Sequence, residues 1–315
     1  MTPFEAKIES VVDSILSDYA AGRDIDKIER VRRPDKDVII DIIDKLRRIV
    51  FPGYFKDKTY RIYNAKHNLS MLIEDVMFNL NRQITLVLQG RGEDPQAAEE
   101  KAQRISLEFF RAIPQVRAVV QTDVQASYDG DPAASGKDEI IFSYPGLFAI
   151  VVYRLAHVLY TLGVPMLPRM MTEHAHSVTC IDIHPGATVG EYFFIDHGTG
   201  IVIGETTVIC NHVKLYQGVT LGALTTRGGQ SLRGKRRHPT IEDNVTIYAG
   251  ASILGGETVI GRDSVIGSNA FITRSIAPGT TVSIKSQELQ FKTRPAAPKG
   301  EDLDQDNAWA CPGKE

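Results

Sequence analysis

Aliphatic residues recur at every sixth position over a long stretch of the second half of this 315-residue chain. They form four runs, from Ile183 to Ile195, Ile203 to Leu221, Ile241 to Ile253 and Ile260 to Ile272. A glycine or another small residue follows many of them. A period of six fits neither an amphipathic helix nor an alternating strand. It is the hexapeptide repeat of a parallel β-helix, in which each hexad supplies one short strand and one corner. The sequence therefore predicts a left-handed parallel β-helix over residues 177–285.

A helical pattern precedes the hexads, so the predicted fold class is α+β, with an α-helical assembly domain over residues 1–176. Pro34–Asp37 has the composition of a helix start, and Gly90–Pro95 that of a break between two helices. Residues 123–144 are polar and contain Gly and Pro, which predicts a loop that contacts substrate. Residues 286–315 are rich in Pro, Gly and charge, which predicts a partly disordered tail.

Two interruptions of the repeat draw attention to possible chemistry. Ile195 and Ile203 are eight positions apart instead of six, and Asp196–Gly200 fills the slip. Between Leu221 and Ile241 the period is lost, and residues 223–237 form a basic, glycine-rich excursion that predicts a protruding loop. A regular solenoid has no structural need for such an insertion, and functional loops interrupt repeats in this way.

His197 lies in the first interruption, and Asp182 precedes it by about one coil of the predicted β-helix. A carboxylate that hydrogen-bonds one ring nitrogen of a histidine fixes its tautomer and raises the basicity of the other nitrogen. This is the arrangement of a general base for a hydroxyl group. The structural alternative is that His197 only closes a turn.

Arg237 and His238 stand where the chain re-enters the repeat, and a cation there can hold a carboxylate or a phosphate. The alternative is a solvated basic run. A β-helical carbonic anhydrase would need three zinc-binding histidines from neighbouring coils, which His197, His212 and His238 do not supply. Asp131, taken alone, is better explained as part of a turn.

Composition excludes several classes of protein. The net charge of −3 gives no reason to expect a nucleic-acid partner. Cys180, Cys210 and Cys311 have no metal-ligand spacing, so we expect no metal, and three unpaired cysteines suit a reducing cytoplasm. The N-terminus has no signal-peptide pattern, and no apolar run reaches the length of a membrane span.

With these residues assembled, the sequence resembles the serine O-acetyltransferases, which are hexapeptide acyltransferases that begin cysteine synthesis. The motifs that carry the resemblance are Asp131-Pro132-Ala133, Asp182-Ile183-His184-Pro185, the segment from Asp196-His197-Gly198-Thr199-Gly200 to Thr206, Gln217 to Gly222, and Arg237-His238-Pro239. Together they cover residues 131–276, and the long helical region resembles the N-terminal domain of that family.

The resemblance implies transfer of acetyl from acetyl-CoA to the hydroxyl of L-serine. It makes His197 the general base and Asp182 the residue that orients it. The implied binding residues are Asp131 and Asp196 for the amino group, Arg237 and His238 for the carboxylate, and Gly222, Ala249 and Gly267 for acetyl-CoA.

The resemblance also implies a homotrimer or a dimer of trimers, with each site shared between two subunits, and feedback inhibition by L-cysteine. Docking with cysteine synthase is not expected, because the sequence ends in Cys311–Glu315 without the terminal isoleucine that inserts into that enzyme. Two alternatives stay open. One is an acyltransferase for another hydroxy amino acid or a sugar, and the other is a non-catalytic scaffold that recruits a partner through its helices or tail.

Overall fold

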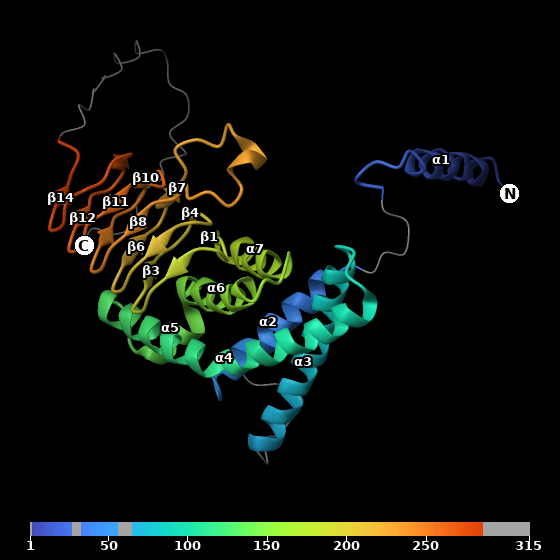
Figure 1. Ribbon diagram of the computed structural model, residues 1–315, viewed down its shortest axis with the longest axis horizontal. Coiled ribbons are helices and arrows are strands. Elements are labelled where there is room, and N and C mark those ends of the chain that lie inside the picture. Colours follow the sequence, from blue (N-terminus) through green and yellow to red (C-terminus); the bar gives the residue numbers. More distant parts are fainter. Residues whose placement is uncertain (1, 27–32, 56–64, 286–315) are drawn as a thin grey trace, which may run out of the picture. The chain divides into compact units, whose positions relative to one another are not determined.

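The computed structural model describes residues 2–26, 33–55 and 65–285 (Figure 1). The predicted tail lies outside these residues, so the prediction of disorder there stays a prediction. Within the described ranges the first part of the chain is helical. The helices are α1 (Pro3–Tyr19), α2 (Lys36–Val50), α3 (Ala65–Gln89), α4 (Pro95–Gly130), α5 (Lys137–Ser143), α6 (Pro145–Thr161) and α7 (Leu167–Thr179).

Local capping explains where two of these helices begin. The Asp35 carboxylate caps α2 by accepting the backbone N–H of Asp37 at 2.8 Å, and Asp94 caps α4 in the same way. Such a cap satisfies a donor that the first helical turn leaves free. The helix start at Pro34–Asp37 and the break at Gly90–Pro95 are thereby confirmed.

The prediction that residues 123–144 form a loop is wrong. Helix α4 continues to Gly130, and α5 occupies Lys137–Ser143, so only a short turn remains between them. Two of the polar residues that suggested a loop are buried inside α4, where Asp123 is fully inaccessible to solvent and Ser127 nearly so. Asp123 is paired with an arginine from another helix, and the sequence pattern does not reveal that partner.

The second part of the described chain is a parallel β-helix of short strands in three sheets. One sheet has the order β1-β4-β7-β10-β13, the second β11-β8-β5-β2 and the third β14-β12-β9-β6-β3. We call them the first, second and third sheets. The strands are β1 (Ile181–Ile183), β2 (Thr188–Val189), β3 (Phe194–Asp196), β4 (Ile201–Ile203), β5 (Val208–Ile209), β6 (Lys214–Tyr216), β7 (Thr220–Gly222), β8 (Thr240–Ile241), β9 (Thr246–Ile247), β10 (Ser252–Leu254), β11 (Val259–Ile260), β12 (Val265–Ile266), β13 (Phe271–Ile272) and β14 (Thr281–Val282).

The hexad anchors stack on one another inside this β-helix, as predicted. In the first sheet Ile183 pairs with Ile203, Ile203 with Leu221, and Leu221 with Ile253, and all four are buried. Apolar residues from the other two sheets complete the same core. Because each coil covers the apolar row of the next, the repeat buries a continuous column of aliphatic side chains.

Both interruptions lie where the chain turns a corner and leave the core register intact. The slip at Asp196–Gly200 falls between β3 and β4, and the excursion falls between β7 and β8. The excursion contains one short 3₁₀ segment, η1 (Gly229–Leu232), and most of its residues are exposed. Insertions at corners add surface without disturbing the stacked residues.

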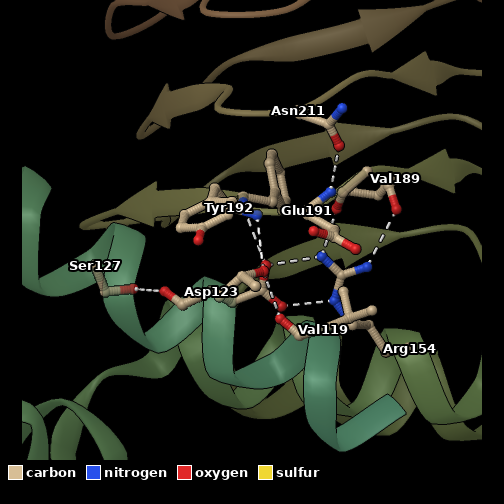
Figure 2. Close-up of polar contacts among 11 residues, drawn as sticks. Val119, Asp123, Ser127, Arg154, Val189, Glu191, Tyr192 and Asn211 are labelled. Atoms are coloured by element: carbon tan, nitrogen blue, oxygen red, sulfur yellow. Dashed lines mark hydrogen bonds and ion pairs between the residues drawn. The ribbon is translucent and has the colours of Figure 1, made fainter. Parts of the chain in front are cut away.

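A buried ion pair joins the helices to the first coil of the β-helix (Figure 2). The guanidinium of Arg154, on α6, donates to both carboxylate oxygens of Asp123, on α4, at 2.6 and 2.8 Å. The same guanidinium donates to the carbonyls of Val189 and Gly190, and Asp123 accepts the backbone N–H of Phe193. One polar cluster thus ties two helices to the turn between β2 and β3.

The change from helix to strand falls at Cys180, a few residues after the boundary expected from the sequence. Within the described ranges, no single helix has the length and apolar character needed to cross a membrane. The bent pair of α5 and α6 passes that test by length and composition only, and most of α6 is buried in the protein.

Candidate active site

The corner between β3 and β4 turns His197 out of the β-helix. His197 has a positive φ of 58°, and Gly198 and Gly200 also have positive φ values. A Cβ atom on Gly198 would lie 2.4 Å from the side chain of Ile181, so this tight turn requires glycine. The His197 side chain is 70% exposed and is free to meet a substrate.

Asp131 is brought to the same corner by the end of α4. Its carboxylate accepts the hydroxyl of Tyr144 at 2.5 Å and the backbone N–H of Ala133 at 2.8 Å. These bonds, together with the nearby charges of Lys214 and His197, lower the pKa of Asp131. The Tyr144 bond in turn raises the pKa of that phenol to about 12. Asp131 is therefore a carboxylate beside a neutral tyrosine at neutral pH.

Asp196 completes an acidic pair at this corner. Its carboxylate is only 14% exposed, and it lies 3.7 Å from the Nε2 atom of His197 and 3.6 Å from the ammonium of Lys214. Two carboxylates beside an exposed imidazole can hold an ammonium group and place a neighbouring hydroxyl near the ring. We call Asp131, Asp196 and His197 the acidic edge.

Asp182 is not hydrogen-bonded to His197 within the described chain. Its carboxylate accepts from the guanidinium of Arg169, on α7, at 3.1 Å, and Arg169 also pairs with Glu173. Asp182 lies in the middle of β1, whereas His197 follows β3. The predicted general base and its predicted orienting group therefore lie at strands of different sheets and have no hydrogen bond to each other.

Arg237 and His238 lie beside the residues where β4 leads into β5. Arg237 pairs with Glu205 at 2.5 Å, and Glu205 also accepts the hydroxyl of Tyr160 at 3.3 Å. The excursion thus returns to the β-helix directly beside the end of β4. We call Arg237 and His238 the cationic edge.

His238 is buried and held in one orientation. Its Nδ1 atom accepts the backbone N–H of Thr206 at 3.0 Å, and its ring lies so close to Gly204 that a Cβ there would come within 2.1 Å. Burial, helped by the charge of Arg237, lowers the pKa of His238 to about 4. The ring is therefore neutral at pH 7 and carries its proton on Nε2, from which it can donate to a carboxylate.

The two edges lie at opposite ends of the strands of the first sheet. The acidic edge precedes β4 and the cationic edge follows it, and β4 is three residues long. Three strand residues span roughly 10 Å. The amino and carboxylate groups of an α-amino acid are bonded to the same carbon atom, so the two edges of one chain are too far apart to hold one such molecule.

The residues expected to contact acetyl-CoA divide in the same way. Ala249 and Gly267 follow β9 and β12, at the corner that also carries the acidic edge, whereas Gly222 ends β7 at the side of the cationic edge. The described residues contain one group that could offer three ligands to a metal ion, Glu173, His176 and Asp182. The guanidinium of Arg169 already contacts two of them.

Sequence reasoning missed several residues around the site. Tyr144, Glu205 and Lys214 each contact a predicted site residue. Each of them comes from a different element than the residue that it contacts, and sequence spacing alone does not show such a contact. Arg169 was missed for the same reason.

Comparisons with known proteins decide the family. The chain is 44% identical over 260 residues to the plasmid serine acetyltransferase of Synechococcus elongatus, an alignment that covers 79% of this chain and 81% of that protein. The chain belongs to the serine acetyltransferase family. It is therefore an acyltransferase, as predicted. No family model matches the chain.

Solved serine acetyltransferases share the fold. Serine acetyltransferase 1 of Entamoeba histolytica in complex with L-cysteine has a TM-score of 0.68 and 37% identity, covering 80% of this chain and 88% of that one. The Neisseria gonorrhoeae enzyme in complex with serine has a TM-score of 0.52 and 28% identity, covering 78% and 97%. A serine acetyltransferase complex with CoA has a TM-score of 0.50 and 27% identity, covering 77% and 96%. The predicted left-handed β-helix is thereby confirmed.

Proposed function

We propose that this acyltransferase moves the acetyl group of acetyl-CoA to the hydroxyl of L-serine, giving O-acetyl-L-serine and free CoA for cysteine synthesis. The observation that carries the proposal is the acidic edge, where two carboxylates lie beside one exposed histidine. That arrangement suits an acceptor with an ammonium group next to its hydroxyl. Relatives that bind serine and CoA support the same substrates.

In the proposed reaction His197 takes the proton of the serine hydroxyl as the oxygen attacks the thioester carbon. The carbon–sulfur bond breaks, and the thiolate of CoA leaves and takes a proton from the imidazolium. Asp131 and Asp196 bind the serine ammonium. Arg237 and His238 bind the carboxylate.

We further propose that two copies of the chain form each site. The acidic edge of one copy would face the cationic edge of another, because the edges within one chain are separated by the width of the first sheet. A trimer closed in this way repeats the same contact three times. Acetyl-CoA would then lie in the groove between copies, with Ala249 and Gly267 on one wall and Gly222 on the other.

Asp182 would orient His197 in this assembly. For this, Arg169 would release Asp182 and keep only its ion pair with Glu173. L-Cysteine differs from serine by a thiol in place of the hydroxyl, so we propose that it occupies the same groups and inhibits. The E. histolytica enzyme in complex with L-cysteine supports this.

A pair of matched variants tests the role of His197. Asparagine tolerates a positive φ and cannot act as a base at neutral pH, so His197→Asn keeps the corner and removes the chemistry. His212→Asn is the control, because His212 is also exposed at a corner with a φ of 57° and stacks on Tyr192 away from the acidic edge. We expect His197→Asn to lower kcat about a hundredfold or more. Equal rates in the two variants would contradict the proposal.

Mixing two inactive variants tests the shared site. In trimers of His197→Asn and Arg237→Ala chains co-assembled at equal amounts, about a quarter of the interfaces would pair an intact acidic edge with an intact cationic edge. We expect roughly that fraction of the wild-type rate to return. No recovery from mixed trimers would mean that each site lies within one chain.

A further inference from the structure

Lys214 occupies an unusual position at the acidic edge. It is the first residue of β6, where it pairs with Phe194 of β3, and its side chain is 20% exposed. Its ammonium donates to the carbonyl of Gly130 at 2.6 Å and lies 3.6 Å from the carboxylate of Asp196. The rings of Phe194 and Tyr216 flank it at 4.8 and 4.7 Å from their centroids.

These contacts fix the ammonium in place. Gly130 is the last residue of α4, where the helix carries partial negative charge on its free carbonyls, and a cation there is favourable. The next residue in the chain is Asp131. One side chain therefore ties Asp196 to the backbone that carries Asp131, although the two aspartates come from separate elements.

The ammonium of Lys214 also changes the charge of the edge. The charged or titratable groups that face one another here are Asp131 from the end of α4, Glu139 from α5, Tyr144 before α6, Asp196 at the end of β3, His197 after β3, and Lys214 from β6. Glu139 is occupied by the hydroxyl and the backbone N–H of Ser135. Tyr144 is neutral, so Asp131, Asp196 and Lys214 together carry a net charge of minus one, and Glu139 is a further carboxylate whose pKa is lowered by its bonds to Ser135.

We propose that Lys214 is a positioning residue for the acceptor. It holds the two aspartates in register and reduces their combined charge to the value that one substrate ammonium neutralises. This inference rests on the proposed function. It explains why the same site would prefer a substrate whose amino group carries a single positive charge.

The consequence of removing Lys214 follows from like-charge repulsion. Two carboxylates without an intervening cation do not both stay ionised easily, so the pKa of one of them rises. The aspartate that takes up the proton attracts the substrate ammonium less than a carboxylate does. Serine binding should then weaken as the pH falls, in a range where the wild-type pair is still fully ionised.

Three variants separate the charge of Lys214 from its structural contact. Lys214→Met keeps the length of the side chain and removes the charge. Lys214→Gln keeps a hydrogen-bond donor for the Gly130 carbonyl without the charge. Lys214→Arg keeps both. The measurements are kcat and the KM for serine between pH 5.5 and 8.5, with circular dichroism as the check on folding.

For Lys214→Met we expect the KM for serine to rise about tenfold and kcat to change less than about threefold, as for loss of one hydrogen bond to a charged group. The acid limb of kcat/KM should move to higher pH in Lys214→Met and Lys214→Gln and stay at the wild-type position in Lys214→Arg. A purely structural contact would give Lys214→Gln the wild-type pH profile.

The inference is overturned if soluble Lys214→Met or Lys214→Gln has a KM within twofold of wild type and an unshifted acid limb. Should Lys214→Met fail to fold, Lys214→Gln carries the same test of the charge. A wild-type protein that releases no thiol in response to serine would instead refute the proposed function.

Discussion

Arg154→Met is the substitution whose cost follows most directly from the structure. Arg154 is 7% exposed in its side chain and Asp123 is fully buried, so the substitution leaves a carboxylate inside the protein with the Phe193 N–H as its remaining donor (Figure 2). The carbonyls of Val189 and Gly190 also lose their donor. Removing one partner of a buried pair costs about 3–5 kcal/mol.

That cost is a large share of the stability of a folded domain, which is about 5–15 kcal/mol. We expect the free energy of unfolding, obtained from urea denaturation monitored by far-UV circular dichroism, to fall by this amount, and the urea midpoint to fall with it. The control is Arg111→Met, which removes an exposed ion pair with Glu108. That change should cost less than about 1 kcal/mol.

A second substitution tests the physical reason for the loss. Asp123→Asn in the Arg154→Met background removes the unpaired charge, so the double variant should be more stable than Arg154→Met alone. Burial raises the pKa of Asp123, and loss of the guanidinium should raise it further. The folded variant then binds a proton more readily than its unfolded chain does, and its deficit in unfolding free energy should shrink as the pH falls from 7 toward 5. A loss below 1 kcal/mol, or additive effects of the two substitutions, would refute this reasoning.

Three further outcomes follow from the site. His238 has a pKa of about 4 in the folded protein, whereas in the unfolded chain it protonates near pH 6.5. The free energy of unfolding, measured by urea denaturation, should therefore fall as the pH drops from about 6.5 to 4. The fall should be smaller in His238→Gln. Gly204→Ala should displace the His238 ring and raise the KM for serine about tenfold or more. The control is Gly136→Ala, where an added Cβ meets nothing and the KM should not change. Equal KM values in the two variants would contradict the placement of His238. L-Cysteine should inhibit competitively with serine, and Asp131→Asn should weaken both to a similar extent, which a series of inhibition curves would show.

The β-helix could be predicted from the sequence because each hexad is a local unit that repeats. Ile203, Leu221 and Ile253 stack as the period requires, and the interruptions between them fall at corners. The loop over residues 123–144 could not be predicted correctly, since Asp123 is polar and its partner Arg154 is distant in sequence. Helix propensity and polarity carry no information about such a partner.

The sequence predicts the residue types of the candidate site but not how they are arranged. Spacing places His197 about one coil after Asp182. It does not show that Arg169, on a neighbouring helix, pairs with the Asp182 carboxylate. Spacing likewise does not show that Arg237 lies across the first sheet from His197. Lys214 looks like an ordinary outward residue of a strand until α4 is placed beside it.

The most direct test of the central claim is the rate of free thiol release from acetyl-CoA, measured with and without L-serine, with the acetylated product identified by mass spectrometry. The predicted result is thiol release that saturates with serine and equals the O-acetyl-L-serine formed, and that exceeds the rates with homoserine or an amino sugar. A folded protein that releases no thiol in response to serine, or that prefers another acceptor, would contradict the account.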